Sequence, residues 1–399
     1  MVIMIRPIHP FPARMAPDVA LEKLGELPTT GVVLDPMVGS GTVLREATGL
    51  GHQAIGFDLD PLAVLMTRVW TMPIDDALIN EVADRVFHRL AGIAATDVSL
   101  PWIDDDSETK TFVEFWFAER QRSDLRRIAY VLDQLSRESE TPDESLAVDL
   151  FKIAFSRLVI TKDKGASLAR DVSHSRPHKV AETNDFNVPM MFIRSLKTVQ
   201  KRLRDAPPAT GATVGFGDAR SLRDVEDGTV DAVLTSPPYL NAIDYMRGHR
   251  LSLVWLGHRL ADLRTIRSTS IGSERAPEHV EEAPELDAMR SAMGAIDQLP
   301  RKFGSMITRY VQDIRRIVLE IARVLKAGAR ATFVVGNSCL RGVFIRNSDA
   351  VAAAARHAEL SLIGETERPL PIRSRYLPMT SEPLGKRMRT ESVLTFARA

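Results

Sequence analysis

A strand-like run near the middle of the chain ends in two prolines. Residues 230–235, VDAVLT, have the apolar character of a buried strand in a parallel sheet, and Ser236, Pro237, Pro238 and Tyr239 follow at once. Because proline lacks an N–H group and has a fixed φ, the pair predicts a stiff loop whose carbonyl oxygens have no ladder to join. Ser236 and the Pro237 carbonyl then offer two hydrogen-bond acceptors beside the ring of Tyr239. This arrangement suits a planar ring that carries an amino group.

Two acceptors beside such an amino group have a chemical consequence. The lone pair of the amine in cytosine or adenine is delocalised into the ring, so the nitrogen is a poor nucleophile until hydrogen bonds to both of its protons favour a pyramidal geometry. Acceptors placed in advance achieve this without reorganisation. The alternative interpretation is an incidental Ser-Pro-Pro turn, and a glycine-rich loop upstream favours the functional one.

That loop, DPMVGSGT at residues 35–42, follows the first strand-like run. Gly39 and Gly41 allow a tight turn and a close approach of the backbone to a ligand, and Ser40 or Thr42 can cap the helix that follows. The loop lacks both the full GxGxxG fingerprint and the lysine of a P-loop. Taken alone, it is equally consistent with a ligand turn and with a structural one.

Aspartates end further strand-like runs. Asp58, about twenty residues after the loop, is placed to accept hydrogen bonds from both ribose hydroxyls of a nucleoside. Asp218 in GFGDARSL could accept a hydrogen bond from an adenine amino group, or serve only as a turn or cap residue. Asp60 is expected to cap the next helix, with Pro61 at its first position. Together with Asp35, these positions predict a nucleoside site along one rim of a sheet.

The elements that must position these loops form an α/β pattern. We expect a Rossmann-like, doubly wound, mostly parallel seven-stranded sheet with a helical insertion, and a ligand crevice at the carboxyl ends of its strands. The insertion is residues 75–210, which have helical periodicity without a convincing strand, whereas 258–300 are expected to form a loop or lid. The seven predicted strands are 31–35, 53–58, 212–218, 230–236, 329–337, 360–366 and 391–397, with helices at about 303–325 and 348–357.

Composition bounds the class of protein. The chain has 399 residues, of which 44% are hydrophobic and 26% charged, enough for one large domain with an insertion or for two domains. Basic and acidic residues both number 52, so nucleic-acid binding would need local basic patches. The single cysteine, Cys339, excludes an intramolecular disulfide and fits a reducing cytoplasm. With no signal peptide, no membrane-spanning run and no metal-ligand spacing among the histidines, we expect a cytoplasmic protein without a metal site.

At this point the motifs resemble a known family. DPMVGSGT followed by TSPPY resembles the S-adenosylmethionine-dependent amino-group DNA methyltransferases, and serine at the first position of the Ser-Pro-Pro-Tyr motif most resembles the cytosine-N4 members. HPFPARMAPDVALEKL at residues 9–24 resembles the family segment that precedes the glycine loop and closes over the methionine end of the cofactor. The resemblance covers roughly residues 6–72 and 212–340.

The resemblance implies a site for S-adenosyl-L-methionine and a division of the chain. Residues 1–74 would form the cofactor-binding half of the methyltransferase domain and 211–399 the catalytic half, with 75–210 as a possible target-recognition region, an inference from its size. Catalysis is implied at Ser236, Pro237, Pro238 and Tyr239. Cofactor contacts are implied at Phe11, Asp35, Pro36, Met37, Gly39, Gly41, Thr42, Asp58, Asp218 and Ala219.

The implied partner is double-stranded DNA with the target base flipped out, which would associate the protein with the nucleoid. A cognate restriction endonuclease and the oligomeric state stay open. Two stretches, 119–127 and 161–179, concentrate Lys, Arg and His that could line a phosphate track. The first is more typical of a solvated helix face, whereas the second is equally consistent with a phosphate track and with a solvated surface. The candidate DNA contacts are Arg170, His174, Arg176, Arg247 and Arg250.

Most of the alternative functions differ in the atom that receives the methyl group. Carbon-5 methylation of cytosine needs a cysteine nucleophile, usually after a proline, and Cys339 has no proline before it. Adenine-N6 methylation of DNA, or methylation of a base in RNA, keeps the same cofactor, and Ser236 favours cytosine because the adenine enzymes typically carry Asp or Asn there. A nucleic-acid-binding protein that has lost activity is a further alternative, against which the intact loop residues argue. Cofactor binding separates it from the enzymes.

Overall fold

A computed structural model describes residues 5–11, 14–159, 164–170, 178–240, 244–272, 281, 283–369 and 390–399, without the side chains of Ala95 and Arg170. The chain divides into two compact units. We call Met1–Pro12, Asp60–Gly211 and Ile243–Arg267 the helical unit, and Ala13–Leu59, Ala212–Ala242 and Ser268–Ala399 the sheet unit.

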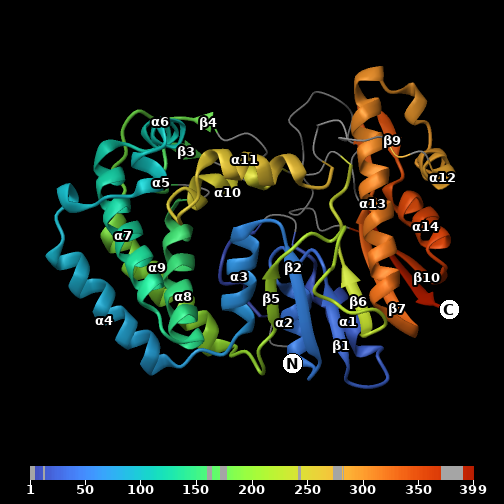
Figure 1. The fold of residues 1–399 in the computed structure, drawn as a ribbon, viewed down its shortest axis with the longest axis horizontal. Helices are drawn as coiled ribbons and strands as arrows, with labels where there is room; N and C mark the ends of the chain where they lie inside the picture. The colour runs from blue at the N-terminus through green and yellow to red at the C-terminus, as the bar shows by residue number, and fades with distance from the viewer. Residues whose placement is uncertain are drawn as a thin grey trace. The chain divides into compact units, whose positions relative to one another are not determined.

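The sheet unit is built on seven strands in the order β10-β11-β7-β6-β1-β2-β5 (Figure 1). Strand β11 runs antiparallel to both of its neighbours, and every other pairing in the sheet is parallel. The expected doubly wound, mostly parallel Rossmann-like sheet is therefore confirmed. The strands are β1 (Val32–Asp35), β2 (Gln53–Asp58), β5 (Thr213–Phe216), β6 (Val230–Thr235), β7 (Leu325–Gly336), β10 (Leu360–Pro369) and β11 (Thr390–Arg398).

The strand order reverses between β1 and β6. From β1 the chain builds outward through β2 to β5, and β6 then pairs with the other side of β1, in a register that sets Val33 against Ala232. In open α/β sheets, ligands bind outside the carboxyl ends of the strands at such a reversal. The topology therefore points to the loops that follow β1 and β6.

Both faces of the sheet are buried at its central strands. Along β1, Val33 and Leu34 belong to different apolar clusters, as the two-residue period of a strand requires. The cluster of Val33 includes α1 (Pro17–Gly25) and α2 (Thr42–Gly49). The cluster of Leu34 includes the helices α12 (Pro284–Ala292), α13 (Gly304–Val324) and α14 (Asn347–His357). The two helices expected near the carboxyl end of the sequence are thus confirmed as α13 and α14.

The helical unit has its own apolar core, with Phe192 in ring contact with Phe151 and Phe155. As expected, the described part of residues 75–210 is mostly helical, with one two-stranded ribbon, β3 (Ala169–Arg170) and β4 (His178–Lys179). The longer helices of the unit are α3 (Pro61–Thr71), α4 (Asp76–Gly92), α6 (Ser107–Trp116), α7 (Glu119–Glu138), α8 (Pro142–Val159), α9 (Val188–Asp205) and α10 (Met246–Leu253).

The expectation of a loop or lid over 258–300 is wrong. Its described residues include α11 (Leu260–Thr269) and α12 (Pro284–Ala292). Leu260 and Leu263 are buried in one helix, and Leu286 and Met289 in the other. A pair of apolar residues three positions apart is enough to bury one face of a short helix, and the surrounding charges hid this spacing.

Two absences apply to the part of the chain that the structure describes. None of its helices is long and apolar enough to cross a membrane. No group of three or more His, Cys, Asp or Glu side chains within it is placed to hold a metal ion.

Candidate functional site

The carboxyl edge of the central strands gathers the polar residues of three motifs. Asp35 is the last residue of β1, Asp58 the last of β2, and Ser236 follows the last residue of β6. Because β1 pairs in parallel with both β2 and β6, these three ends meet at one edge of the sheet. The sheet thus brings the glycine loop and the Ser-Pro-Pro-Tyr loop together.

The glycine loop between β1 and α2 is closed by hydrogen bonds to β2. Gly39 and Gly41 have φ angles of +49° and +82°, which explains glycine at both positions. The Val38 N–H donates to the Phe57 carbonyl at 3.0 Å, and the Gly39 N–H donates to Asp58 Oδ2 at 2.9 Å. One role of Asp58 is therefore to fix the loop at the sheet edge.

The prediction that Ser40 or Thr42 caps α2 is wrong. Gly41 occupies the N-cap position in the left-handed conformation, and no side chain caps the helix. Ser40 therefore precedes the cap and Thr42 already belongs to the helix, so their hydroxyl oxygens, 3.1 Å apart, hydrogen-bond to each other instead. The loop thus consists mainly of backbone, which suits a close approach by a ligand.

Asp35 is a buried carboxylate, and one of its two oxygens accepts hydrogen bonds. Its Oδ1 accepts hydrogen bonds from Thr235 Oγ1 at 2.7 Å and from the Met37 N–H at 3.1 Å. Within the described residues, Oδ2 has no hydrogen-bond partner. Burial raises the pKa of Asp35 to about 7, and the charge of Asp58 acts in the same direction. A cationic group placed near Oδ2 would favour the ionised form.

Asp218 lies in a turn after β5, and both of its oxygens accept hydrogen bonds from Arg220. The Nε and Nη2 atoms of Arg220 lie 2.9 and 2.7 Å from Oδ1 and Oδ2, respectively. Ala219 is buried in the apolar cluster of α13 and α14. Of the other implied cofactor contacts, Pro36 is buried and Met37 half-buried at the carboxyl end of β1.

The Ser-Pro-Pro-Tyr loop is held to the neighbouring strands at both ends. Ser236 Oγ donates to the Val334 carbonyl of β7 at 2.9 Å. Beyond the loop, the hydroxyl of Ser338 in β8 (Ser338–Leu340) donates to the Leu240 carbonyl at 2.8 Å. Because the hydroxyl proton of Ser236 is directed at β7, its remaining lone pairs are available only to accept. Pro237 is buried, and Tyr239 is half-buried.

Phe11 belongs to the helical unit, where it contacts other aromatic rings. Its ring centroid lies 5.2 Å from that of Tyr245 and 5.5 Å from that of His249. His249 Nδ1 hydrogen-bonds to Asp60 Oδ2, and both residues are buried. The other carboxylate oxygen of Asp60 accepts the Leu62 N–H at 2.9 Å, which confirms Asp60 as the cap of α3.

The candidate DNA contacts of α10 have partners inside the helical unit. Arg247 Nε lies 2.9 Å from Asp244 Oδ2. The guanidinium of Arg250 lies 5.1 Å from the ring centroid of Phe112, and burial lowers its pKa. Arg170 contributes backbone to β3, while His174 and Arg176 lie outside the described residues.

The basic stretch 119–127 forms the start of α7, and three of its four arginines bind the protein itself. Arg126 makes two 2.8 Å hydrogen bonds to the carboxylate of Asp104, and Arg127 donates to the Leu90 carbonyl. Arg122 donates to two further backbone carbonyls. This geometry favours the interpretation as a helix face whose cations serve the fold.

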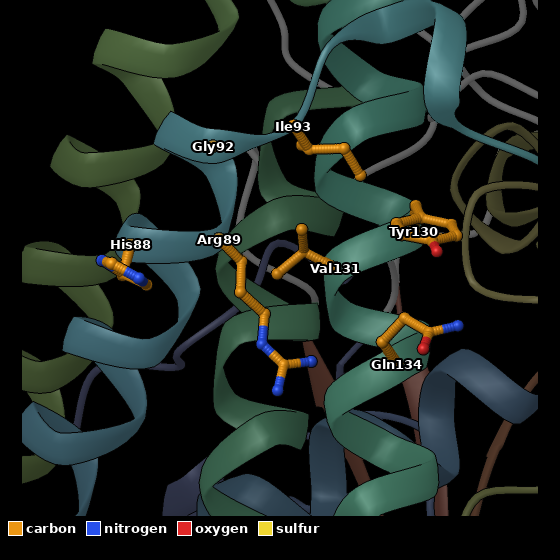
Figure 2. Close-up of a pocket in the computed structure, with 7 residues that line it drawn as sticks. All are labelled: His88, Arg89, Gly92, Ile93, Tyr130, Val131 and Gln134. Atoms are coloured by element: carbon orange, nitrogen blue, oxygen red, sulfur yellow. The ribbon is translucent and has the colours of Figure 1, made fainter.

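A hollow of about 350 Å³ lies elsewhere in the helical unit, lined by residues of α4 and α7 (Figure 2). It contains none of the motif residues, and the guanidinium of Arg89 in its lining is paired with Glu138. Its lining is His88, Arg89, Gly92, Ile93, Tyr130, Val131 and Gln134.

Three residues that support the site were not predicted. Thr235 donates to Asp35, Ser338 holds the end of the Ser-Pro-Pro-Tyr loop, and Arg220 binds Asp218. The Asp-Ala-Arg spacing of 218–220 was the available signal for Arg220. Nothing in the sequence brings Ser338 near Leu240, because 98 positions separate them.

Comparisons with known proteins place this chain beside methyltransferases. No family model matches the sequence. It is 20% identical over 402 aligned residues to the Type II methyltransferase M.MvaI of Kocuria varians, a match that covers 95% of this chain and 86% of that protein. It is 23% identical over 368 residues to the Type II methyltransferase M.BsoBI of Geobacillus stearothermophilus, covering 78% of this chain and 70% of that protein.

Solved structures match more weakly. A DNA modification methylase of Thermus thermophilus is 15% identical with a TM-score of 0.24, over 46% of this chain and 50% of the other, so the match spans about half the length of that methylase. A geranyl diphosphate methyltransferase is 8% identical with a TM-score of 0.36, over 96% and 78% of the two chains. The two relatives matched by sequence, which cover 95% and 78% of this chain, are both Type II methyltransferases.

Proposed function

We propose that this protein is a DNA methyltransferase that transfers the methyl group of S-adenosyl-L-methionine to the N4 amine of cytosine. The observation that carries the proposal is the Ser236 hydroxyl, whose proton is directed at the Val334 carbonyl. Ser236 Oγ and the Pro237 carbonyl are then two acceptors for the two protons of a target amine. They lie at the sheet edge that also carries the glycine loop.

The residues at this edge suit the cofactor. The glycine loop offers backbone to the methionine part, and a carboxylate at the position of Asp58 suits the ribose hydroxyls. Asp35 suits the ammonium group, since its Oδ2 has no partner among the described residues. S-adenosyl-L-methionine, when bound, supplies an electrophilic methyl group. The protein orients that group and the amine without a covalent intermediate.

The reaction needs little acid–base help from the protein. Hydrogen bonds from the amine to Ser236 and Pro237 favour a pyramidal nitrogen, and the ring of Tyr239 provides a face for the base. The nitrogen becomes acidic once it carries the methyl group, and water can take the proton. Because the amine lies inside a duplex, the base has to be flipped out. A mismatched partner opposite the target base should therefore tighten binding, and equal affinity for matched and mismatched duplexes would count against flipping.

Transfer of label tests the proposal. Purified protein incubated with S-adenosylmethionine carrying a labelled methyl group should label unmethylated double-stranded DNA more strongly than RNA of the same base composition. Preferential labelling of RNA would assign the enzyme to the RNA alternative. A protein that binds DNA without binding the cofactor would be the inactive nucleic-acid-binding alternative.

A further inference from the structure

A buried ion-pair network lies behind the Asp218 turn of the sheet unit. The side chain of Arg220 is only 13% exposed, and it binds three different groups. Besides Asp218, it donates from Nη1 to Asp313 Oδ1 and from Nη2 to the Thr269 carbonyl, both at 2.8 Å. One guanidinium therefore joins the turn after β5, helix α13 and the chain at Thr269.

A second arginine repeats part of this pattern. Arg309, one turn before Asp313 on α13, has its Nε 3.6 Å from Asp313 Oδ2, an atom that accepts no hydrogen bond from the described residues. Arg309 Nη2 donates to the Ser268 carbonyl at 2.8 Å. The two arginines therefore share one buried carboxylate and bind consecutive carbonyl groups. Removing either charge would leave the other groups buried and incompletely paired, which is costly.

The segment 268–272, which these arginines hold, ends beside Tyr239 of the Ser-Pro-Pro-Tyr loop. Gly272 has a φ of +71°, and a Cβ at this position would lie 3.3 Å from the carbonyl oxygen of Tyr239. Because glycine lacks that Cβ, the backbone of the segment can lie beside the Tyr239 carbonyl, and a larger residue at 272 would have to displace one of the two. The segment that Arg220 and Arg309 hold therefore borders Tyr239.

We infer that Arg220 is a positioning residue that links the cofactor pocket to the loop that receives the target amine. The inference rests on the proposed function, together with the contact from Asp218 to the adenine amino group of the cofactor that the sequence predicts. Arg220 orients the carboxylate of Asp218, and the same side chain holds the segment 268–272 against Tyr239. A shift of Arg220 therefore affects cofactor affinity and the rate of methyl transfer together.

Arg220→Lys tests this link, because lysine keeps the charge but cannot reach three partners in fixed directions. We expect a cofactor Kd raised by about tenfold and a single-turnover rate at saturating cofactor lowered by about 10- to 100-fold. Calorimetry gives the first value and rapid-quench labelling the second. A change in only one of them, or in neither, overturns the link.

Arg323→Lys is the matched control. Arg323 lies on α13, the helix to which Arg220 binds, and its guanidinium likewise binds several groups, with Nε 3.0 Å from Glu320 Oε1 and Nη2 2.8 Å from the Leu222 carbonyl. Among the described residues, none of its hydrogen bonds goes to Asp218 or to the segment 268–272. We expect wild-type affinity and rate for this variant. Losses equal to those of Arg220→Lys would mean that disturbing any multiply bonded arginine beside α13 has the same effect, which contradicts the link.

A second variant keeps the inference testable if Arg220→Lys does not fold. Gly272→Ala places a Cβ against Tyr239 at a φ that disfavours alanine, and it leaves Arg220 and Asp218 intact. We expect a transfer rate lowered by about tenfold or more with the cofactor Kd within about twofold of wild type. A wild-type rate overturns the role of the segment. If the wild-type protein itself neither binds cofactor nor transfers methyl groups, the proposed function fails instead.

Discussion

The sheet unit and the helical unit use their charged side chains differently. In the sheet unit, Asp35 and Asp58 end adjacent strands and bind backbone N–H groups of the loop between them. In the helical unit, many charges pair with one another, as in Arg126 with Asp104 and Arg204 with Asp76. The hydrogen bonds of Asp35 and Asp58 given above come from backbone N–H groups and a hydroxyl, whereas Asp104 and Asp76 bind guanidinium groups of other helices. We therefore expect Asp35 and Asp58 to bind a ligand more readily than the paired arginines of the helical unit.

The largest effect is expected for Ser236→Ala in the sheet unit. The variant removes one of the two acceptors of the amine and leaves the glycine loop unchanged, so kcat should fall by about 10²- to 10³-fold with cofactor affinity almost intact. Single-turnover assays at saturating cofactor measure the loss. Ser236→Asp is the control that restores an acceptor, and it should retain part of the activity. A wild-type rate for Ser236→Ala would remove the hydroxyl from the mechanism.

Asp58→Ala should weaken cofactor binding by about 1.5–3 kcal/mol, the scale of charge-assisted hydrogen bonds lost from ribose hydroxyls. Part of the loss comes from the Gly39 N–H, which loses its acceptor. Asp58→Asn keeps an acceptor for that N–H and should bind more tightly than the alanine variant. Calorimetry on the folded variants measures their cofactor affinities. Unchanged affinity for Asp58→Ala would exclude Asp58 from the cofactor site.

Asp35→Asn should make the protein without bound cofactor more stable at high pH. Since the pKa of Asp35 is raised to about 7, the folded state holds a proton between about pH 4 and pH 7 that the unfolded chain has lost. The stability of the wild-type protein therefore falls as the pH rises through this window, and asparagine does not titrate. We expect a gain on the order of 1–2 kcal/mol at pH 8, less than the full shift allows because the buried amide brings its own unpaired N–H groups.

Thermal unfolding of wild type and Asp35→Asn at pH 4.5 and pH 8 measures this effect. The Tm difference between the two proteins should be larger at pH 8, and the variant should bind the cationic cofactor more weakly. A Tm difference that does not change with pH would show that Asp35 is ionised throughout the range.

The smallest effects are expected in the helical unit. Replacing Lys162, Lys164 and Arg170 with glutamine should flatten the slope of log K against log salt for DNA by up to about 0.9 for each phosphate that is no longer neutralised. Arg126→Gln is the control, since Arg126 is only 23% exposed in its pair with Asp104 and should contribute nothing to the slope, whereas Lys164 is 65% exposed in its pair with Asp185. Filter binding over a salt series gives both values. A larger change for Arg126→Gln than for the triple variant would reverse the order expected for the two basic stretches.

Sequence reasoning succeeded where a local pattern determines the structure. The apolar runs that end at Asp35, Asp58 and Thr235 predicted the central strands and the sheet edge where they meet, because strand period and strand ends are local properties. Asp60 was correctly identified as a helix cap for the same reason.

The sequence did not predict contacts between residues that lie far apart along the chain. The hydroxyl of Ser236 is oriented by Val334, and the segment at Thr269 is held by Arg220, pairs separated by 98 and 49 positions. The same limit explains why the sequence favoured a solvated helix face for the arginines of α7 but could not give their partners. Asp104 and the Leu90 carbonyl, which bind two of its arginines, come from elsewhere in the helical unit.

Mass spectrometry of the methylated nucleoside tests the central claim most directly. DNA treated with the wild-type protein and S-adenosylmethionine is digested to nucleosides, and the modified base is identified by its mass and retention time. Two preorganised acceptors at Ser236 and Pro237, with no cysteine beside a proline, predict N4-methylcytosine. N6-methyladenine would overturn the assignment of Ser236 to cytosine, and 5-methylcytosine would contradict the mechanism itself, because carbon-5 attack needs a covalent nucleophile that this loop lacks.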